Sequence, residues 1–334
     1  MSDTMIETRE LTKRYDGVLA VDKVSLSVPK GQVLGFLGPN GAGKTTTMRI
    51  LTCFTAPTEG GASINGCDVL LDAIGARRAI GYLPESNPLY PDMLAVEYLR
   101  FAANVRGIDK VEAQKRIKTI VEETGLGAYY DRPIRTLSKG YRQRVGLAQA
   151  LIHQPPILIL DEPMSGLDPN QAVEIRDLIR EIGRSRTVVL STHNLGEVAV
   201  ACNRVVIISK GRIVADDTPE HLREHAGKRT CHVSVLKQEP VADFTRKCES
   251  AFGALPAVER VRTVTGDNDA ELAFELLPRG DDDLRAAVFR ACVEHSFTLV
   301  GLRHEGQNLE QIFRELTTGA TGANASAAAA ARAN

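Results

Sequence analysis

GPNGAGKT, residues 38 to 45, is a complete stretch of the form G-x-x-x-x-G-K-(S/T). The apolar run 32–37 before it is typical of a buried strand, and residues 46–51 after it are typical of the first turns of a helix. In that setting the glycines let backbone N–H groups wrap a phosphate, and the helix N-terminus adds partial positive charge. We therefore expect a nucleotide-binding loop formed by Gly38, Pro39, Asn40, Gly41, Ala42, Gly43, Lys44, Thr45 and Thr46.

Two side chains of this loop carry specific chemistry. Lys44 can reach the β- and γ-phosphates, and the Thr45 hydroxyl is placed to bind Mg²⁺. The alternative is a Gly-rich turn that ends in Lys-Thr by chance. Because a strand pattern precedes the stretch and a helix pattern follows it, the sequence favours a loop that binds a nucleoside triphosphate with Mg²⁺.

A second apolar run, residues 156–160, is too short for a helix and is typical of a central parallel strand. It ends in Asp161 and Glu162. At the carboxyl end of a strand beside the phosphate loop, Asp161 would hold Mg²⁺ through its water shell and Glu162 would polarise the attacking water. Adjacent carboxylates are more often solvated turn residues, but an apolar strand and an upstream nucleotide loop weaken that interpretation.

Three further segments accompany these two motifs. In LSKGYRQRVGLAQAL, residues 137–151, Ser138 can cap the helix that follows and Gly140 permits close backbone approach to an anion. SGLD, residues 165–168, follows the carboxylate pair. Another apolar strand pattern, residues 188–193, ends in His193.

In this order and spacing, residues 6–217 resemble the nucleotide-binding cassette of ATP-binding cassette (ABC) transporters. Residues 38–45 match the Walker A loop, 157–162 match Walker B, 137–141 match the signature sequence and 165–168 match the D-loop. His193 matches the switch histidine. Tyr15 stands where the family stacks an aromatic ring on adenine. The resemblance implies an ATPase in which Glu162, His193 and Glu85 are catalytic, with Thr45, Asp161 and Glu85 as the Mg²⁺ ligands.

The resemblance also implies partners. In this family two cassettes close head to tail around ATP, so Ser138 and the Gly140 N–H would clamp the γ-phosphate held by Lys44 of a second copy. One chain contains one Walker A loop and one signature, and we therefore expect a second cassette, as a homodimer. We also expect a separate integral membrane permease, with this chain peripheral on the cytoplasmic face of the cell membrane.

The chain departs from the family pattern at the signature and at the Q-loop. The signature carries Lys139 and Tyr141 in place of Gly and Gln, while Ser138 and Gly140 remain. Glu85 stands where the family has a glutamine, and it would add a charged oxygen near Mg²⁺ and repulsion toward Glu162. Glu85 as a functional adjustment and Glu85 as a tolerated substitution remain open alternatives. Both departures are typical of ATPases from the ABC-2 type exporter branch, which includes gliding-motility-associated and multidrug systems.

Composition is in keeping with a cytoplasmic subunit. The 334 residues include 41 basic and 42 acidic side chains, which gives a net charge of −1. The chain therefore has no excess of positive charge of the kind that predicts nucleic-acid binding. No apolar run approaches the roughly 18 residues of a membrane span, and residues 1–7 lack the features of a secretory signal. The six cysteines, without metal-ligand spacing, are typical of buried free thiols in a reducing compartment.

The predicted fold class is α/β. Residues 1–225 should form a P-loop NTPase cassette with an antiparallel β subdomain and a helical insert at about 90–135. Residues 226–318 should form a small α+β accessory domain, because strands and helices over 230–302 follow the βαββαβ order of a ferredoxin-like fold. We expect an amphipathic helix over 309–316. Residues 319–334, mostly Ala and Gly, should be disordered.

These observations predict an ATP-hydrolysing subunit of an ABC exporter. A soluble ABC ATPase of DNA repair or translation is the first alternative, but such proteins usually carry two cassettes or a long coiled-coil insertion. An importer ATPase is the second, and the sequence at Glu85 and the signature disfavours it. The transported substrate is not encoded in this chain, because the translocation path belongs to the permease.

Overall fold

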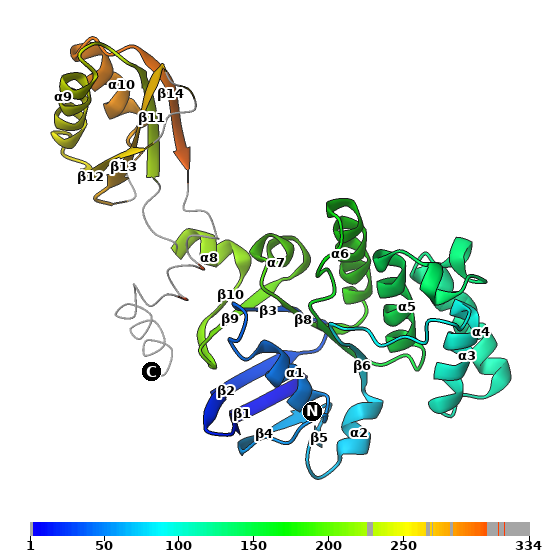
Figure 1. Cartoon of the computed structure of the whole chain (residues 1–334). Helices are drawn as coiled ribbons and strands as arrows, with labels where there is room; N and C mark the ends of the chain where they lie inside the picture. Colours follow the sequence, from blue (N-terminus) through cyan, green and yellow to red (C-terminus); the bar gives the residue numbers. More distant parts are fainter. Residues whose placement is uncertain are drawn as a thin grey trace. The chain divides into compact units, whose positions relative to one another are not determined.

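The computed structural model describes residues 3–225, 230–264, 268, 270–280, 283–305, 313 and 317. The chain divides into two compact units (Figure 1). One is Met1–Pro219 together with Leu316–Asn334, and the other is Glu220–Glu315.

The first unit is built on a six-stranded sheet in the order β10-β9-β3-β8-β7-β6. All neighbours in it are parallel except β10, which runs antiparallel to β9 at the edge. Every residue of β3, β7 and β8 is buried, which explains their continuous apolar runs. Because these three strands are parallel, their carboxyl ends deliver the phosphate loop, Glu162 and His193 to one edge of the sheet. The strands are β3 (Val33–Leu37), β6 (Ile80–Leu83), β7 (Ile157–Asp161), β8 (Thr187–Thr192), β9 (Arg204–Ser209) and β10 (Arg212–Asp217).

Helices begin within or directly after the sequence motifs. Three of them have polar caps, because Ser138 accepts from the Tyr141 N–H and Asp168 and Asn194 cap the two helices that follow. The predicted cap at Ser138 is thus confirmed. These helices are α1 (Lys44–Leu51), α5 (Lys139–Leu151), α6 (Pro169–Gly183) and α7 (Leu195–Ala201).

An antiparallel sheet in the order β2-β1-β4-β5 completes the first unit. Its buried residues, such as Ile6 and Leu11, share one hydrophobic cluster with Phe36 and Ile159 of the parallel sheet, so the two sheets form a single core. Burial of this cluster is the main driving force that fixes the phosphate loop between them. The elements are β1 (Thr4–Tyr15), β2 (Val18–Pro29), β4 (Glu59–Ile64), β5 (Cys67–Asp68) and α2 (Ala73–Arg78).

The predicted helical insert contains α3 (Ala95–Val105) and α4 (Lys110–Glu123), followed by two 3₁₀ turns, Gly127–Tyr129 and Ile134–Thr136. Its aromatic residues differ in exposure. Tyr90 is half exposed, whereas Tyr98 is buried. The edge-to-face contact of Tyr98 with Tyr90 makes it part of the packing of the insert.

The second unit has a four-stranded antiparallel sheet in the order β12-β13-β11-β14, with the connectivity of the predicted ferredoxin-like fold. Phe252 and Phe274 are fully buried in a core that belongs to this unit alone. Its elements are α8 (Pro219–His225), β11 (Thr230–Leu236), α9 (Val241–Gly253), β12 (Val258–Val264), β13 (Glu271–Pro278), α10 (Arg285–Glu294) and β14 (Leu299–Glu305). The predicted helix over 309–316 and the tail 319–334 lie outside the described residues, apart from position 313, which is helical.

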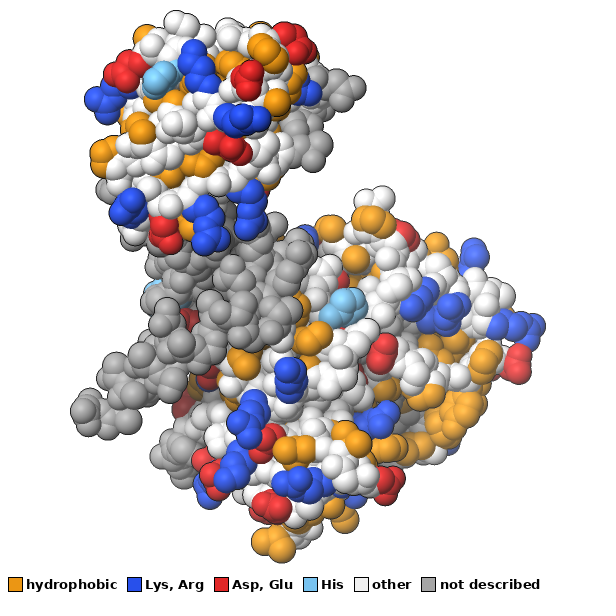
Figure 2. Space-filling model, turned by 60° about the vertical axis from the view of Figure 1, so that its left-hand side comes forward, with side chains coloured by type: hydrophobic (Ala, Val, Ile, Leu, Met, Phe, Trp, Pro, Cys, Tyr) orange, Lys and Arg blue, Asp and Glu red, His pale blue; other side chains and the backbone are white. Residues whose placement is uncertain are grey.

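Basic and acidic side chains intermingle on the molecular face drawn in Figure 2. Two of the six cysteines, Cys53 and Cys67, are partly exposed, so the prediction that all six thiols are buried is wrong for these two. Within the described part of the chain, no helix combines the length and the apolar character needed to cross a bilayer.

Candidate functional site

A polar cavity of about 570 Å³ lies at the carboxyl edge of the parallel sheet. The phosphate loop forms one side of it, and the residues that follow β6, β7 and β8 contribute the rest. Its size suits a nucleotide. The lining residues are Ala20, Pro39, Asn40, Gly41, Gly43, Lys44, Thr45, Thr46, Glu85, Glu162, Ser165 and His193.

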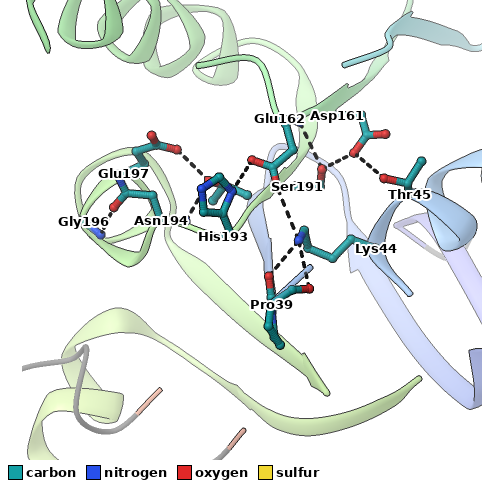
Figure 3. Close-up of polar contacts among 12 residues, drawn as sticks. Pro39, Lys44, Thr45, Asp161, Glu162, Ser191, His193, Asn194, Gly196 and Glu197 are labelled. Carbon is teal, nitrogen blue, oxygen red and sulfur yellow. Dashed lines mark hydrogen bonds and ion pairs between the residues drawn. The ribbon is translucent and has the colours of Figure 1, made fainter. Parts of the chain in front are cut away.

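The loop keeps its shape through glycine conformations and the Lys44 ammonium. Gly41 and Gly43 have φ angles of 78° and 107°, which a side chain would strain, and a Cβ on Gly43 would also meet the Ala20 carbonyl oxygen at 2.5 Å. Lys44 Nζ donates to the carbonyl oxygen of Gly38 at 2.7 Å (Figure 3). The cation is therefore held within the curve of the loop, where a phosphate would sit.

Lys44 also pairs with the carboxylate that follows β7. Its Nζ lies 3.3 Å from Oε1 of Glu162, and both side chains are over 90% buried. Two buried opposite charges stabilise each other only when each has further polar partners. Lys44 has its loop carbonyls, and Glu162 has His193, so the pair sits in a polar network.

Glu162 and His193 meet across the ends of β7 and β8. Nδ1 of His193 lies 2.9 Å from Oε2 of Glu162. Glu162 has a φ of 49°, an unusual conformation for this residue type that turns its side chain into the cavity. Its backbone N–H donates to the Ser191 carbonyl oxygen at 3.1 Å, which holds that conformation in place. A carboxylate so placed can accept a proton from a water beside the phosphate loop.

Oxygen ligands for a divalent cation gather beside this pair. Thr45 Oγ1 lies 3.4 Å from Oδ1 of Asp161, and Ser191 donates to the same carboxylate oxygen. Hydroxyl and carboxylate oxygens are the ligands that Mg²⁺ prefers, so Thr45 and Asp161 fit this ion. Glu85 lines the same cavity and could add a third oxygen.

Five residues predicted to bind nucleotide do not line this cavity. Two of them, Gly38 and Ala42, belong to the phosphate loop itself, and the other three are Tyr15, Ser138 and Gly140. Tyr15 is 41% exposed at the end of β1, with Lys13 Nζ 4.8 Å from its ring centre. Ser138 and Gly140 lie at the start of α5, next to the D-loop. A Cβ on Gly140 would meet the Gln171 side chain at 2.8 Å, and one on Gly166 would meet Lys139 Nζ at 2.3 Å. The signature and D-loop thus form a joint surface of their own.

The structure adds residues that the sequence motifs did not single out. Ser191 bonds both Asp161 and the Glu162 backbone. Ser165, the first residue of the D-loop motif, lines the cavity, a place that the sequence did not assign to it. Glu197 bonds the loop that carries His193. The sequence could have pointed to these contacts. Ser191 and Thr192 stand directly before His193 at the end of a buried strand, and buried polar side chains need hydrogen-bond partners.

The family described as ABC transporter matches residues 21–165. The chain is 33% identical over 311 residues to YxlF of Bacillus subtilis, an uncharacterized ABC transporter ATP-binding protein, and the match covers 92% of this chain and 98% of that protein. The chain belongs to the ATP-binding proteins of ABC transporters.

Other members of the family support the same assignment. The daunorubicin/doxorubicin resistance ATP-binding protein DrrA of Streptomyces peucetius is 32% identical to this ABC protein over 316 residues, which cover 93% of this chain and 92% of DrrA. The MJ0796 ATP-binding cassette, solved as a dimer bound to ADP and Pi, superposes with a TM-score of 0.59 at 26% identity. That match covers 64% of this chain and 99% of MJ0796. The predicted P-loop cassette fold is confirmed.

Proposed function

We propose that this ABC protein is the ATP-hydrolysing subunit of an exporter and drives a separate membrane permease. The observation that carries the proposal is the contact of Glu162 with both Lys44 and His193 at the phosphate loop. A binding protein without hydrolysis needs the loop, but it does not need a buried carboxylate placed beside a histidine at the γ-phosphate position.

Hydrolysis follows from the roles that these side chains can take. Lys44 moves from its Glu162 contact to the phosphates of bound ATP, and Glu162 accepts the proton of the attacking water. His193, through Nδ1, orients the Glu162 carboxylate. Thr45, Asp161 and Glu85 would hold Mg²⁺, which offsets the negative charge of the phosphate oxygens.

A second copy of the chain would complete the site. Ser138 and Gly140 do not line the cavity of their own chain. They lie at the start of α5, where Ser138 is exposed and Gly140 is buried, and this helix N-terminus would bind the γ-phosphate held by another copy. The dimeric MJ0796 cassette supports this arrangement by similarity. ATP would close two copies, and loss of the γ-phosphate would release them.

Similarity to DrrA supports export, and membership of a transporter family supports a permease partner. The chain would then lie on the cytoplasmic face of the membrane, bound through its permease. We further propose that residues 1–225 act as the cassette and 226–318 as an accessory domain. A soluble role in DNA repair or translation, and an importer, are the alternatives that the experiments below separate.

The first test is hydrolysis by the purified full-length chain. Glu162→Gln should keep ATP binding and lower turnover by about two to four orders of magnitude, because it removes the proton acceptor. Lys44→Ala should instead weaken ATP binding about tenfold to a hundredfold, since it removes a charged contact to phosphate. Glu181→Gln and Lys110→Ala change exposed residues of the same types and should behave as the wild-type protein.

Near-normal turnover of Glu162→Gln would remove Glu162 from the proposed role. The transport function needs its own test, which is affinity purification of the tagged chain from membranes of its native cell. A co-purified polytopic membrane protein whose vesicles extrude substrate on addition of ATP is the expected result. Co-purification with ribosomes or DNA, or ATP-driven uptake, would contradict it.

A further inference from the structure

Glu197 is a half-buried carboxylate that the reaction above does not use. It lies in the first turn of α7, just beyond His193 (Figure 3). Burial raises the pKa of Glu197, and the nearby charge of Glu162 adds to this effect. An acidic residue in a helix first turn is ordinarily a favourable surface feature, but this one points back toward the catalytic loop instead of into solvent.

The Glu197 carboxylate binds Thr192, the residue directly before His193. Thr192 Oγ1 donates to Glu197 Oε2 at 2.7 Å. The nearby Asn194 side chain lowers the pKa of the same carboxylate, against the effect of burial. The Thr192 hydroxyl also accepts from the Asn194 backbone N–H at 3.0 Å, which closes a tight turn around His193.

The turn is tied to the phosphate loop as well. The carbonyl oxygen of Thr192 accepts from the Gly38 N–H at 3.3 Å. The His193 side chain itself is 54% exposed. Its ring contacts the Glu162 carboxylate through Nδ1. An exposed imidazole with one such contact depends on its backbone for its orientation, because its own packing does not fix the rotamer.

We propose that Glu197 is a positioning residue of the hydrolytic site. It holds the Thr192 hydroxyl, which in turn binds the Asn194 backbone N–H on the other side of His193, and so fixes the imidazole against Glu162. The inference rests on the proposed ATPase function. A carboxyl oxygen accepts the hydrogen bond from Thr192 whether or not the group is ionised, so the role belongs to the oxygen as an acceptor. Glutamine retains that acceptor and alanine does not.

The test is a double-mutant cycle between Glu197 and His193 in the purified full-length chain. Glu197→Ala should lower kcat for ATP about tenfold to a hundredfold, the cost of a displaced catalytic group, and leave KM within about twofold. In a His193→Ala background the same change should alter kcat by less than about twofold, because Glu197 acts through the histidine. Glu197→Gln and Thr192→Ser should retain most of the activity, whereas Thr192→Val should resemble Glu197→Ala.

Glu181→Ala, on the exposed side of α6, is the matched control and should leave kcat unchanged. Additive losses in the cycle would overturn the proposal, as would a Glu197→Gln variant as slow as Glu197→Ala. Because His193→Ala turnover can fall below detection, the second measurement is NMR of ¹³C-histidine-labelled protein. The His193 Cε1–H signal, assigned by its loss in His193→Ala, should shift in Glu197→Ala and Thr192→Val but not in Glu181→Ala.

An unshifted signal would contradict the inference even without kinetics. The two proposals fail separately. A wild-type chain that does not hydrolyse ATP in its purified complex removes the proposed function. If the wild-type chain is active but the losses of kcat in the cycle are additive, or the His193 signal does not shift, only the role of Glu197 is contradicted.

Discussion

At the scale of single residues, the site depends on charges that are each matched to a partner. Lys44 and Glu162 are both buried, and each would be costly without the other. Asp161 is satisfied by Thr45 and Ser191, and the strained backbone of Glu162 is held by Ser191. Glu85 lines the same cavity, at the position that the family resemblance aligns with a glutamine.

Glu85→Gln isolates the charge at this position, because the two side chains have nearly the same shape. A carboxylate should bind Mg²⁺ more tightly than an amide does, while it repels Glu162 and the phosphates. We expect metal binding to dominate, so the variant should need several-fold more Mg²⁺ for half-maximal ATP hydrolysis. Mg²⁺ titrations of the two proteins check this. Superimposable curves would show that Glu85 does not contact the metal.

At the scale of elements, the site is positioned by close packing between strand ends and helix starts. β6 leads directly to Glu85, and α5 begins with the signature. The two elements touch through Gly81, where a Cβ would lie 2.3 Å from the Ala150 carbonyl oxygen and 2.7 Å from a Leu158 methyl. Backbone cannot yield as a flexible side chain can, so this contact sets the spacing of β6 and α5.

Gly81→Ala should therefore lower the free energy of unfolding by about 1 to 3 kcal/mol, the usual cost of an overpacked core position. Gly61→Ala is the matched control, because an added Cβ there meets nothing within 4 Å, and its effect should stay within about 0.5 kcal/mol. Urea unfolding followed by circular dichroism measures both. Equal stability of the two variants would show that β6 and α5 can separate without cost.

At the scale of the whole molecule, each unit has a hydrophobic core of its own. The two sheets of the first unit share one cluster, and the second unit buries Phe252 and Phe274 in another. Every residue that lines the nucleotide cavity belongs to the first unit. A unit with its own core and its whole cavity can fold and bind alone.

Residues 1–225 lack the segment Leu316–Asn334 of the first unit but contain its whole core cluster and cavity. They should accordingly fold in one cooperative transition and bind Mg-ATP with an affinity close to that of the full chain. Saturating ATP should raise the melting temperature of both, since ligand binding stabilises the folded state. Differential scanning fluorimetry and ATP titration make the comparison. A truncated chain that is insoluble, or that binds no nucleotide, would place part of the cassette core beyond residue 225.

The sequence by itself determined the cassette, because its chemistry is local. A phosphate loop needs glycines, Lys44 and Thr45 in one short run between a strand and a helix, and parallel buried strands need continuous apolar runs. The same local patterns predicted the strand and helix order of the second unit. The carboxylates after β7 and the histidine after β8 were also visible, since strand ends are marked by the change from apolar to polar residues.

Only the tertiary structure decided which of these residues meet. It placed Glu162 between Lys44 and His193, excluded Tyr15, Ser138 and Gly140 from the cavity of their own chain, and buried Tyr98. It also brought Glu197 back onto the turn that carries His193. Such contacts join residues from different strand ends and helix starts, so they depend on strand order and packing, which no local pattern of residue types records.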